Sequence, residues 1–335
     1  MKQQIKKVMT SGLKKVCLCC VPAQRDKMLP YAQAEQILRR HSPDPGAVCP
    51  DRTMECREYD LSVLVPVYAG DEELKQCLDS VFSQDTGFRY EVIVLERGFR
   101  QEIPEAVEQY GEQENLRLVR QSCRSVSGAQ RRGLPSVRGS YVMFLDPRDR
   151  LSEGSIEALL GAAAAGNPDI LRGRGKESTV WGRIYRTELL RDISFPESYW
   201  FEDPLITGFL NYLSDRAEAL DRVVYERNRE EGSREKPGSI DTFYMLRSVL
   251  EARQILGLPT DSGFYEQILL QMIQCIRRSS RDPERVRKSI FTLFQKLLQE
   301  QRCLADIHLG SQYDQLEELL LQGDYRKFRL LCALW

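Results

Sequence analysis

The stretch LSVLVPVYAGDEELKQCLDSVFSQ, residues 61–84, decides the fold class of this 335-residue chain. It opens with a short, Val-rich apolar run that Pro and Gly end, which is typical of a β-strand buried on both faces. Apolar side chains then recur at helical spacing, which predicts an α-helix directly after the strand. These side chains are Leu74, Cys77, Leu78, Val81 and Phe82.

The same alternation of strand and helix continues along the chain. Strands are expected at YEVIVL (90–95), LRLVR (116–120) and YVMFLD (141–146), and helices at 103–110 and around 128–137. Strands separated by helices imply right-handed crossovers. The sequence therefore predicts an α/β fold with a mostly parallel central sheet and helices on both faces.

From Ser239 onward the pattern becomes purely helical. The segment GFYEQILLQMIQCI (263–276) gathers its apolar side chains on one helical face, which indicates a packing surface. An all-α region is therefore expected after the sheet. The side chains of that face are Tyr265, Ile268, Leu269, Met272, Ile273 and Ile276.

Polar side chains follow three of the predicted strands at the point where each strand ends. The clusters are Pro66–Tyr68, Glu96–Gly98 and Asp146–Asp149. Ligands of open parallel sheets bind beyond the carboxyl ends of the strands, so we expect these clusters to meet at one crevice. Carboxylates at a strand end suit a hard divalent cation on a diphosphate, but they also suit an Asx turn or a helix cap.

A second acidic cluster lies in YWFEDPLITGFL, residues 199–210. Glu202 and Asp203 precede an apolar helical segment there. Acids are favourable at a helix start for electrostatic reasons alone, so a simple cap explains them as well as a chemical role does.

The composition disfavours several classes of function. The 48 Lys and Arg residues against 49 Asp and Glu leave a net charge of −1, so no global field attracts nucleic acid. The sequence has no P-loop motif, and two histidines do not favour a Ser-His-Asp triad. The ten cysteines are scattered without CxxC pairs, which fits reduced thiols in a cytoplasmic protein.

The N-terminal segment MKQQIKKVMTSGLKKVCLCCVPAQ, residues 1–24, is basic and then apolar. It is a weak match to a signal peptide. It also suits a basic helix on anionic lipid, with its cysteines as acylation sites, and a solvated tail explains it equally well. Peripheral association with the cytoplasmic face of a membrane is one expectation, because no apolar run approaches the roughly 20 residues of a membrane span.

In order and spacing, these motifs resemble the family-2 glycosyltransferases, the inverting, nucleotide-sugar-dependent enzymes of GT-A fold that build bacterial surface polysaccharides. The resemblance implies a GT-A domain over 58–235, between a basic leader and linker (1–57) and a helical C-terminal region (236–335). It is carried by the opening stretch, VLERGF (94–99), SGAQRRGLPSVRGSYVMFLDPRDRL (127–151), VWGRIYRTELLRDISFPESYWFED (180–203) and, more weakly, YERNREEGS (225–233).

The resemblance also implies roles for single residues. Asp203, with Glu202 beside it, would take the proton from the acceptor hydroxyl as general base. Asp146 and Asp149 would bind Mg or Mn on the diphosphate of the donor. The donor nucleotide would contact Pro66, Tyr68 and Glu96, and a glycan or lipid-linked acceptor would contact Trp181.

The departures from the family pattern lie on the donor side. The family has two aspartates where this chain has Glu96-Arg97, and D-x-D-D where this chain has Asp146-Pro147-Arg148-Asp149. Either Arg148 supplies the positive charge that a metal would have given, or the donor site has decayed and Arg148 only pairs with its neighbours. A catalytically impaired GT-A module that binds a partner or glycan is therefore the alternative to an active transferase. A sugar nucleotidyltransferase would need a Gly-rich, Arg-containing loop that PVYAGDEE does not supply.

Overall fold

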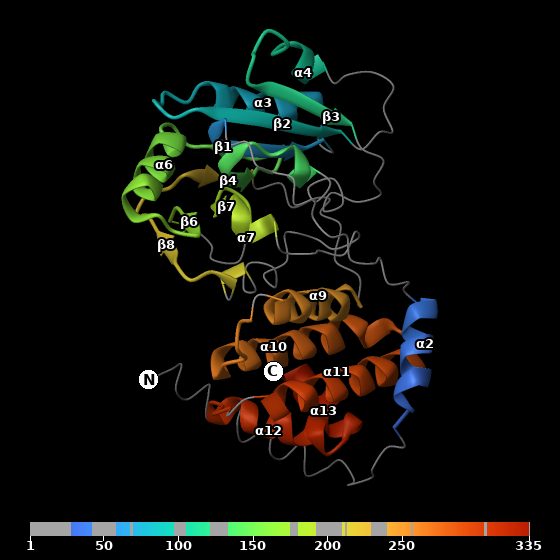
Figure 1. The fold of residues 1–335 in the computed structure, drawn as a ribbon. Helices are drawn as coiled ribbons and strands as arrows, with labels where there is room; N and C mark the ends of the chain where they lie inside the picture. The colour runs from blue at the N-terminus through green and yellow to red at the C-terminus, as the bar shows by residue number, and fades with distance from the viewer. Residues whose placement is uncertain are drawn as a thin grey trace, which may run out of the picture. The chain divides into compact units, whose positions relative to one another are not determined.

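The computed structural model describes two compact units of the chain (Figure 1). The sheet unit contains the β-strands with their helices, and the helical unit contains helix α2 and helices α9 to α13. The residues described are 28–41, 58–67, 70–96, 105–120, 133–174, 180–191, 210–211, 213–228, 240–255, 257–304 and 307–334.

The sheet unit is built on seven strands in the order β3-β2-β1-β4-β7-β6-β8. The pairs β1–β2, β1–β4, β2–β3 and β6–β8 are parallel, whereas β7 runs antiparallel to β4 and β6. The prediction of a mostly parallel central sheet is thus confirmed. The strands are β1 (Tyr59–Pro66), β2 (Tyr90–Glu96), β3 (Leu116–Arg120), β4 (Gly139–Phe144), β6 (Ile170–Arg172), β7 (Ile184–Arg186) and β8 (Ala217–Ala219).

A second, two-stranded sheet pairs β5 (Arg150–Leu151) antiparallel with β9 (Tyr225–Glu226). These strands are too short to show a periodic pattern, so the sequence did not predict them. Their pairing brings residues 225–228 next to the segment that follows β4, because β5 begins six residues after Phe144.

The helices of the sheet unit are α3 (Asp71–Phe82), α4 (Glu105–Glu108), α6 (Ser155–Gly166) and α7 (Thr187–Arg191). The helix predicted after the first strand is confirmed as α3. The helix predicted at 103–110 is shorter, since α4 gives way to turns after Glu108. Of the helix predicted around 128–137, the described part is the helical residue Gly133 followed by a 3₁₀ turn, Leu134–Ser136. Pro135 in this turn has no backbone N–H to donate.

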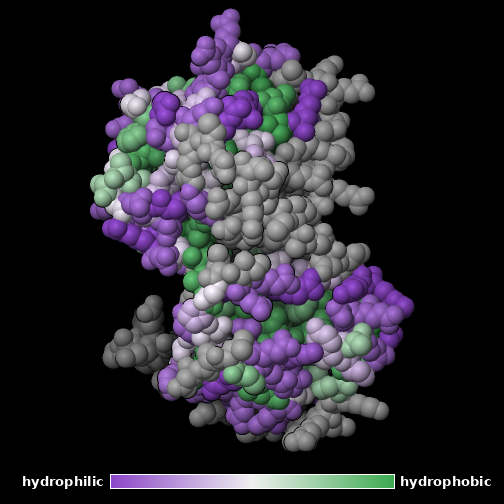
Figure 2. Space-filling view, in the orientation of Figure 1, coloured by the Kyte–Doolittle hydropathy of each residue, from purple (hydrophilic) through white to green (hydrophobic). Residues whose placement is uncertain are grey.

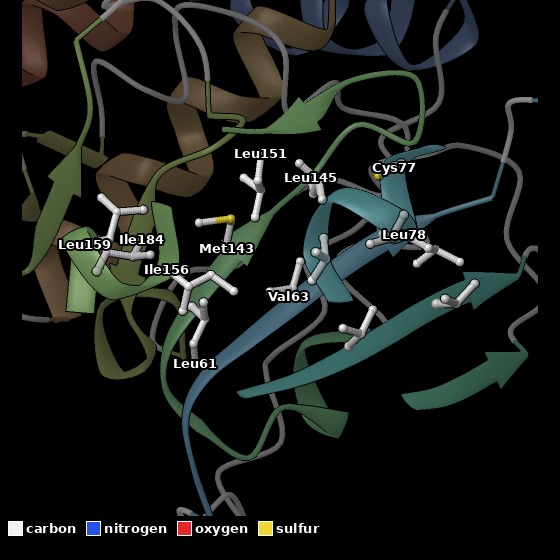
Figure 3. Close-up of a cluster of buried hydrophobic side chains, with 14 of the residues drawn as sticks. Leu61, Val63, Cys77, Leu78, Met143, Leu145, Leu151, Ile156, Leu159 and Ile184 are labelled. Carbon is white, nitrogen blue, oxygen red and sulfur yellow. The ribbon is translucent and has the colours of Figure 1, made fainter. Parts of the chain in front are cut away.

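The core of the sheet unit lies between the strands and the helices that cover them. Figure 3 shows Cys77 and Leu78 of α3 above Val63 of β1, with Met143 of β4 and Ile156 of α6 in the same cluster. The alternate side chains of the strands are buried as well, and Leu64, Ile93 and Phe144 have no exposed surface. The central strands are therefore buried on both faces, as the apolar run at 61–68 predicts.

Glu91 is a charged residue inside this sheet, and a network of donors holds its carboxylate. The Ser62 hydroxyl donates to it at 2.6 Å, the Arg138 backbone N–H at 2.8 Å and the Arg117 guanidinium at 3.0 Å. Ser62 and Glu91 are fully buried. Because a buried carboxylate is costly unless it is paired, these donors are a requirement of the fold.

We expect Ser62→Ala to lower the free energy of unfolding by about 1–3 kcal/mol, because the buried carboxylate loses one donor. The Ser62 Oγ also accepts the Gly139 N–H at 2.9 Å, so the change removes a link between β1 and β4. Chemical denaturation of the variant checks this, with Ser83→Ala, at an exposed position, as the control. Equal stabilities of the two variants would show that the network contributes little.

The helical unit consists of α2 (Tyr31–His41), α9 (Asp241–Ile255), α10 (Ser262–Arg278), α11 (Glu284–Leu304), α12 (Ser311–Leu321) and α13 (Tyr325–Leu334). This confirms the all-α C-terminal region, and every side chain of the predicted apolar face of α10 is buried. Helix α2 lies beside α11, where the Lys296 ammonium sits 4.1 Å from the Tyr31 ring centroid (Figure 1).

The surface of the helical unit is mostly polar on the face that Figure 2 shows, where green apolar side chains appear only in small groups. Among the described residues, none of the helices combines the length and hydropathy needed to cross a membrane.

Candidate active site

Three of the predicted strand ends share one edge of the sheet. Strands β1, β2 and β4 are parallel and adjacent, with β1 in the middle, so their carboxyl ends lie together. The ladder continues to these ends, where the Val67 N–H donates to Leu95 O at 2.9 Å and the Leu145 N–H donates to Leu64 O at 3.0 Å. Two strand spacings make roughly 10 Å, which is the scale of the separation across this edge.

Asp146, directly after β4, is bound on both carboxylate oxygens by Arg148. The Arg148 Nε donates to Oδ1 at 3.1 Å and a terminal guanidinium nitrogen donates to Oδ2 at 3.0 Å. The Arg148 backbone N–H also donates to Oδ1, at 3.0 Å, which makes the Asx-type turn that the sequence allowed. Asp146 is fully buried and the Arg148 side chain is 12% exposed, so this is a buried bidentate ion pair.

Asp149 is held by two groups that come much later in the sequence, from β9 and the residues after it. The Tyr225 hydroxyl donates to Oδ2 and the Asn228 backbone N–H donates to Oδ1 at 2.8 Å. Gly182 makes room for the Tyr225 ring, since it has a φ of 68° and a Cβ there would lie 2.4 Å from the ring. The β5–β9 pairing thus brings Tyr225 and Asn228 to the Asp149 carboxylate.

The carboxylates of Asp146 and Asp149 affect two neighbouring groups. Burial, together with these two negative charges, raises the pKa of the Cys77 thiol well above its usual value. The same causes raise the pKa of the Tyr225 hydroxyl. Both groups therefore stay protonated at neutral pH, and Tyr225 is a hydrogen-bond donor to Asp149.

Glu96 and Trp181 are buried, at 2% exposure each. The Glu96 Oε2 lies 3.5 Å from the Arg120 Nε at the end of β3. Trp181 forms a parallel bridge with Phe144, so it borders the carboxyl end of β4. The Trp181 side chain exposes little surface. Its predicted contact with an acceptor stays a prediction.

A model of glycosyl transferase family 2 matches residues 62–243, which is more than half of the chain. The chain belongs to this family. The match covers the strands, the segment after β4 and residues 225–228, so the residues that surround Asp146 and Asp149 all lie inside the family domain.

Two curated family relatives are bacterial proteins. The glycosyltransferase GlyA of Streptococcus pneumoniae is 22% identical over 258 residues, which are 62% of this chain and 37% of that protein. The minor teichoic acid biosynthesis protein GgaB of Bacillus subtilis is 30% identical over 105 residues, which are 30% of this chain and 12% of that protein. The chain thus spans only a part of these relatives.

Among solved structures, a fragment of Staphylococcus aureus TarS in complex with UDP-GlcNAc is similar in fold. The TM-score is 0.62 at 19% identity, and the similarity covers 82% of this chain and 90% of that fragment. This agrees with the GT-A fold that the resemblance to family 2 implies.

The resemblance to family 2 implies Mg or Mn on the donor diphosphate, but the described residues do not fit a metal ion. The oxygens of Asp146 accept from Arg148, and those of Asp149 accept from Tyr225 and Asn228. Among the described residues, no three His, Cys, Asp or Glu side chains gather as metal ligands would. The Arg148 guanidinium is a positive charge bonded to Asp146.

Three predicted residues of the family-2 site, Tyr68, Glu202 and Asp203, lie outside the described residues. The structure in turn adds Tyr225 and Cys77 to the surroundings of the Asp146–Asp149 segment. Tyr225 opens the segment YERNREEGS, which carried the resemblance only weakly, so family likeness was the one signal for it.

Proposed function

We propose that this chain transfers a sugar from a nucleotide-sugar donor to a glycan or lipid-linked acceptor, with inversion at the anomeric carbon. One observation carries the proposal: in a family-2 domain, Pro66, Glu96 and the Asp146–Arg148 pair lie at one edge of a parallel sheet. Ligands of such sheets bind at this edge. The relatedness to GgaB supports a role in cell-surface polysaccharide biosynthesis.

Arg148 is the residue we assign to the donor diphosphate. Its guanidinium is fixed by Asp146, and a fixed guanidinium matches the geometry of phosphate oxygens. Asp146 thereby orients Arg148 instead of ligating a metal ion. Pro66, Tyr68 and Glu96 are the proposed contacts of the nucleotide.

The proposed reaction is a single displacement. The acceptor hydroxyl attacks the anomeric carbon, the bond from that carbon to the diphosphate oxygen breaks, and the nucleoside diphosphate leaves with the bonding electrons. Asp203 takes the hydroxyl proton, with Glu202 beside it. One base and no covalent intermediate give inversion. Trp181 is the proposed acceptor contact.

The second candidate function is a catalytically impaired module that binds a glycan or a protein partner. The same ion pair favours this second function, because the Arg148 guanidinium is already bonded to both carboxylate oxygens of Asp146. In this module Arg148 pairs with Asp146 and binds no diphosphate. The two candidates differ in whether the guanidinium still binds a diphosphate.

We place the protein in the cytoplasm, with residues 1–24 as a peripheral contact to the membrane that holds lipid-linked acceptors. This segment lies outside the described residues. Its basic side chains and its cysteine cluster support the proposal.

A panel of nucleotide sugars tests the transferase proposal. UDP-, GDP- and dTDP-sugars are added to the full chain with and without Mn, and UDP-GlcNAc is the first donor to test because the TarS fragment was solved with it. A donor should raise the melting temperature by mass action. If no donor of the panel raises the melting temperature, the result would favour the impaired module.

A further inference from the structure

Basic side chains gather at one end of the helical unit. The end of α10 and the start of α11 (residues 277–288), together with the start of α13 (residues 324–329), carry nine Arg and Lys residues against three acids. This is an excess of six positive charges in a chain whose net charge is −1. We call these two segments the basic end. Its basic residues are Arg277, Arg278, Arg281, Arg285, Arg287, Lys288, Arg326, Lys327 and Arg329.

The packing of the helices brings the two segments of the basic end together. The Tyr325 ring centroid at the start of α13 lies 5.4 Å from that of Phe291 in α11. Four residues later, the Arg329 guanidinium pairs with Glu284 in the first turn of α11 at 3.3 Å, so the two helices are antiparallel. Helix α10 packs against both of them or their connections (Figure 1). The exposed basic residues of this end are Arg277, Arg281, Arg285, Arg326 and Arg329.

The acids of the basic end are already in ion pairs within it. Glu284 pairs with Arg287 as well as with Arg329. Asp324 pairs with Lys327 at 3.5 Å. These pairs order some of the basic side chains, but the excess of positive charge at this end is what is left after the acids have been counted.

Helix stability does not account for this charge. Basic residues suit the end of α10, because cations are favourable at the C-terminus of a helix. Helices α11 and α13, however, begin here, and cations in a first turn face the positive end of the helix dipole. Arg285 and Arg287 lie in the first turn of α11, and Arg326 and Lys327 lie in that of α13. The charge therefore opposes local stability, as expected where an anionic partner outside the unit binds it.

The side chains of α13 favour a lipid surface over a nucleic acid as this partner. One side of the helix combines basic and apolar residues at helical spacing, which suits the headgroup level of a membrane. Single-stranded nucleic acids stack their bases on exposed aromatic rings, but Tyr325 and Phe328 of α13 are buried. The residues on that side, all at least partly exposed, are Arg326, Arg329, Leu330 and Ala333.

The described part of the chain begins beside the basic end. Met28 lies next to Gly323, which directly precedes the α13 segment, since a Cβ on Gly323 would lie 3.7 Å from the Met28 Cγ. Residues 1–27, which come before it in the sequence, contain seven Lys and Arg residues and one acid. Stable attachment of a peripheral protein to a membrane takes two weak signals. The basic end and the basic leader join the helical unit at neighbouring points and carry the same charge.

We infer that the basic end docks the helical unit on the surface of a membrane that contains anionic phospholipids. The exposed arginines lie at the level of the headgroups, and the attraction is the sum of many charges. No single residue has to be available for one ligand. The inference concerns the helical unit and its binding to lipid, so it stands or falls separately from the proposed transferase activity.

Vesicle sedimentation of the full chain, without any sugar donor, tests the basic end. The vesicles contain phosphatidylcholine with about 30% phosphatidylglycerol, or phosphatidylcholine alone. The wild type should sediment with the anionic vesicles only, and about 1 M salt should release it by screening. The triple variant Arg277→Gln/Arg281→Gln/Arg285→Gln should bind the anionic vesicles at least about tenfold more weakly, because each basic residue near the surface contributes about fivefold.

The matched control is Arg89→Gln/Arg174→Gln/Arg216→Gln, which removes three exposed arginines from the sheet unit and makes the same change of net charge. It should bind like the wild type, and equal melting temperatures show that both variants fold. The inference is overturned if the wild type does not bind anionic vesicles, if binding persists in about 1 M salt, or if the two triple variants bind equally well. Tighter binding to a DNA duplex than to the vesicles, lost in the basic-end variant, would overturn it in favour of a nucleic acid.

Discussion

Replacing Arg148 by Asp is expected to lower the free energy of unfolding by about 3–5 kcal/mol in metal-free buffer, because it removes the partner of a buried carboxylate. Asp146 has no exposed surface, and Arg148 donates to both of its oxygens. The new carboxylate would also repel Asp146 and Asp149. Chemical denaturation in the presence of EDTA measures the loss.

The same variant should acquire a dependence on divalent cations that the wild type lacks. Three carboxylates, at positions 146, 148 and 149, are oxygen ligands that a hard cation prefers. Added Mn should therefore raise the melting temperature of Arg148→Asp by mass action and leave the wild type unchanged. Donor binding by the variant should likewise require Mn or Mg.

Arg150→Asp is the matched control, since it makes the same charge change two residues later at an exposed position. Its stability should change by about 0.5 kcal/mol or less, as for surface substitutions generally. If Arg148→Asp behaved like this control, with no loss of stability and no response to Mn, then Arg148 would not replace the charge of a metal.

Arg148→Ala separates the two candidate functions, because it weakens donor binding only if the wild type binds a donor.

Asp203→Asn should lower kcat by about 10²–10⁴-fold, the usual contribution of a general base. The amide keeps the shape of the side chain but cannot accept the hydroxyl proton. The affinity for the donor should survive, because the base acts on the acceptor. Initial rates at saturating donor, together with a donor titration, measure the two quantities separately.

Glu202→Gln and Asp215→Asn complete this test. If Asp203 is the base, Glu202→Gln should lower kcat less than Asp203→Asn does. Asp215 is exposed, so its amide variant should keep the wild-type rate. A wild-type turnover that Asp203→Asn leaves unchanged would refute the assignment of the base, even in a proven glycosyltransferase.

The sheet was predictable because its central strands are short, continuous, Val-rich apolar runs bounded by turn residues, which is typical of strands buried on both faces. Residues 61–66 and 141–144 are examples, and both lie in the middle of the sheet. The positions that follow these strands could also be predicted, because parallel strands bring their carboxyl ends to one edge. The acids at this edge, Glu96 and Asp146, were therefore identified from sequence.

The contacts of these acids could not be predicted in the same way. Tyr225 and Asp149 are separated by 76 residues, and only the pairing of two strands of two residues brings them together. Ser62 and Glu91 meet across two neighbouring strands, where the strand pattern alone gives no reason for a buried acid. The sequence likewise allowed two explanations for Arg148. Its bidentate bond to Asp146, two residues away, is compatible with both of them.

The most direct test of the donor site is a calorimetric titration of the wild-type chain with UDP-GlcNAc, or with the donor that the panel selects, in EDTA and again in Mn. If Arg148 supplies the charge opposite the diphosphate, the donor should bind in EDTA, and its Kd should be the same in both buffers. Binding that occurs only with Mn, or no binding of any donor in either buffer, would contradict the account.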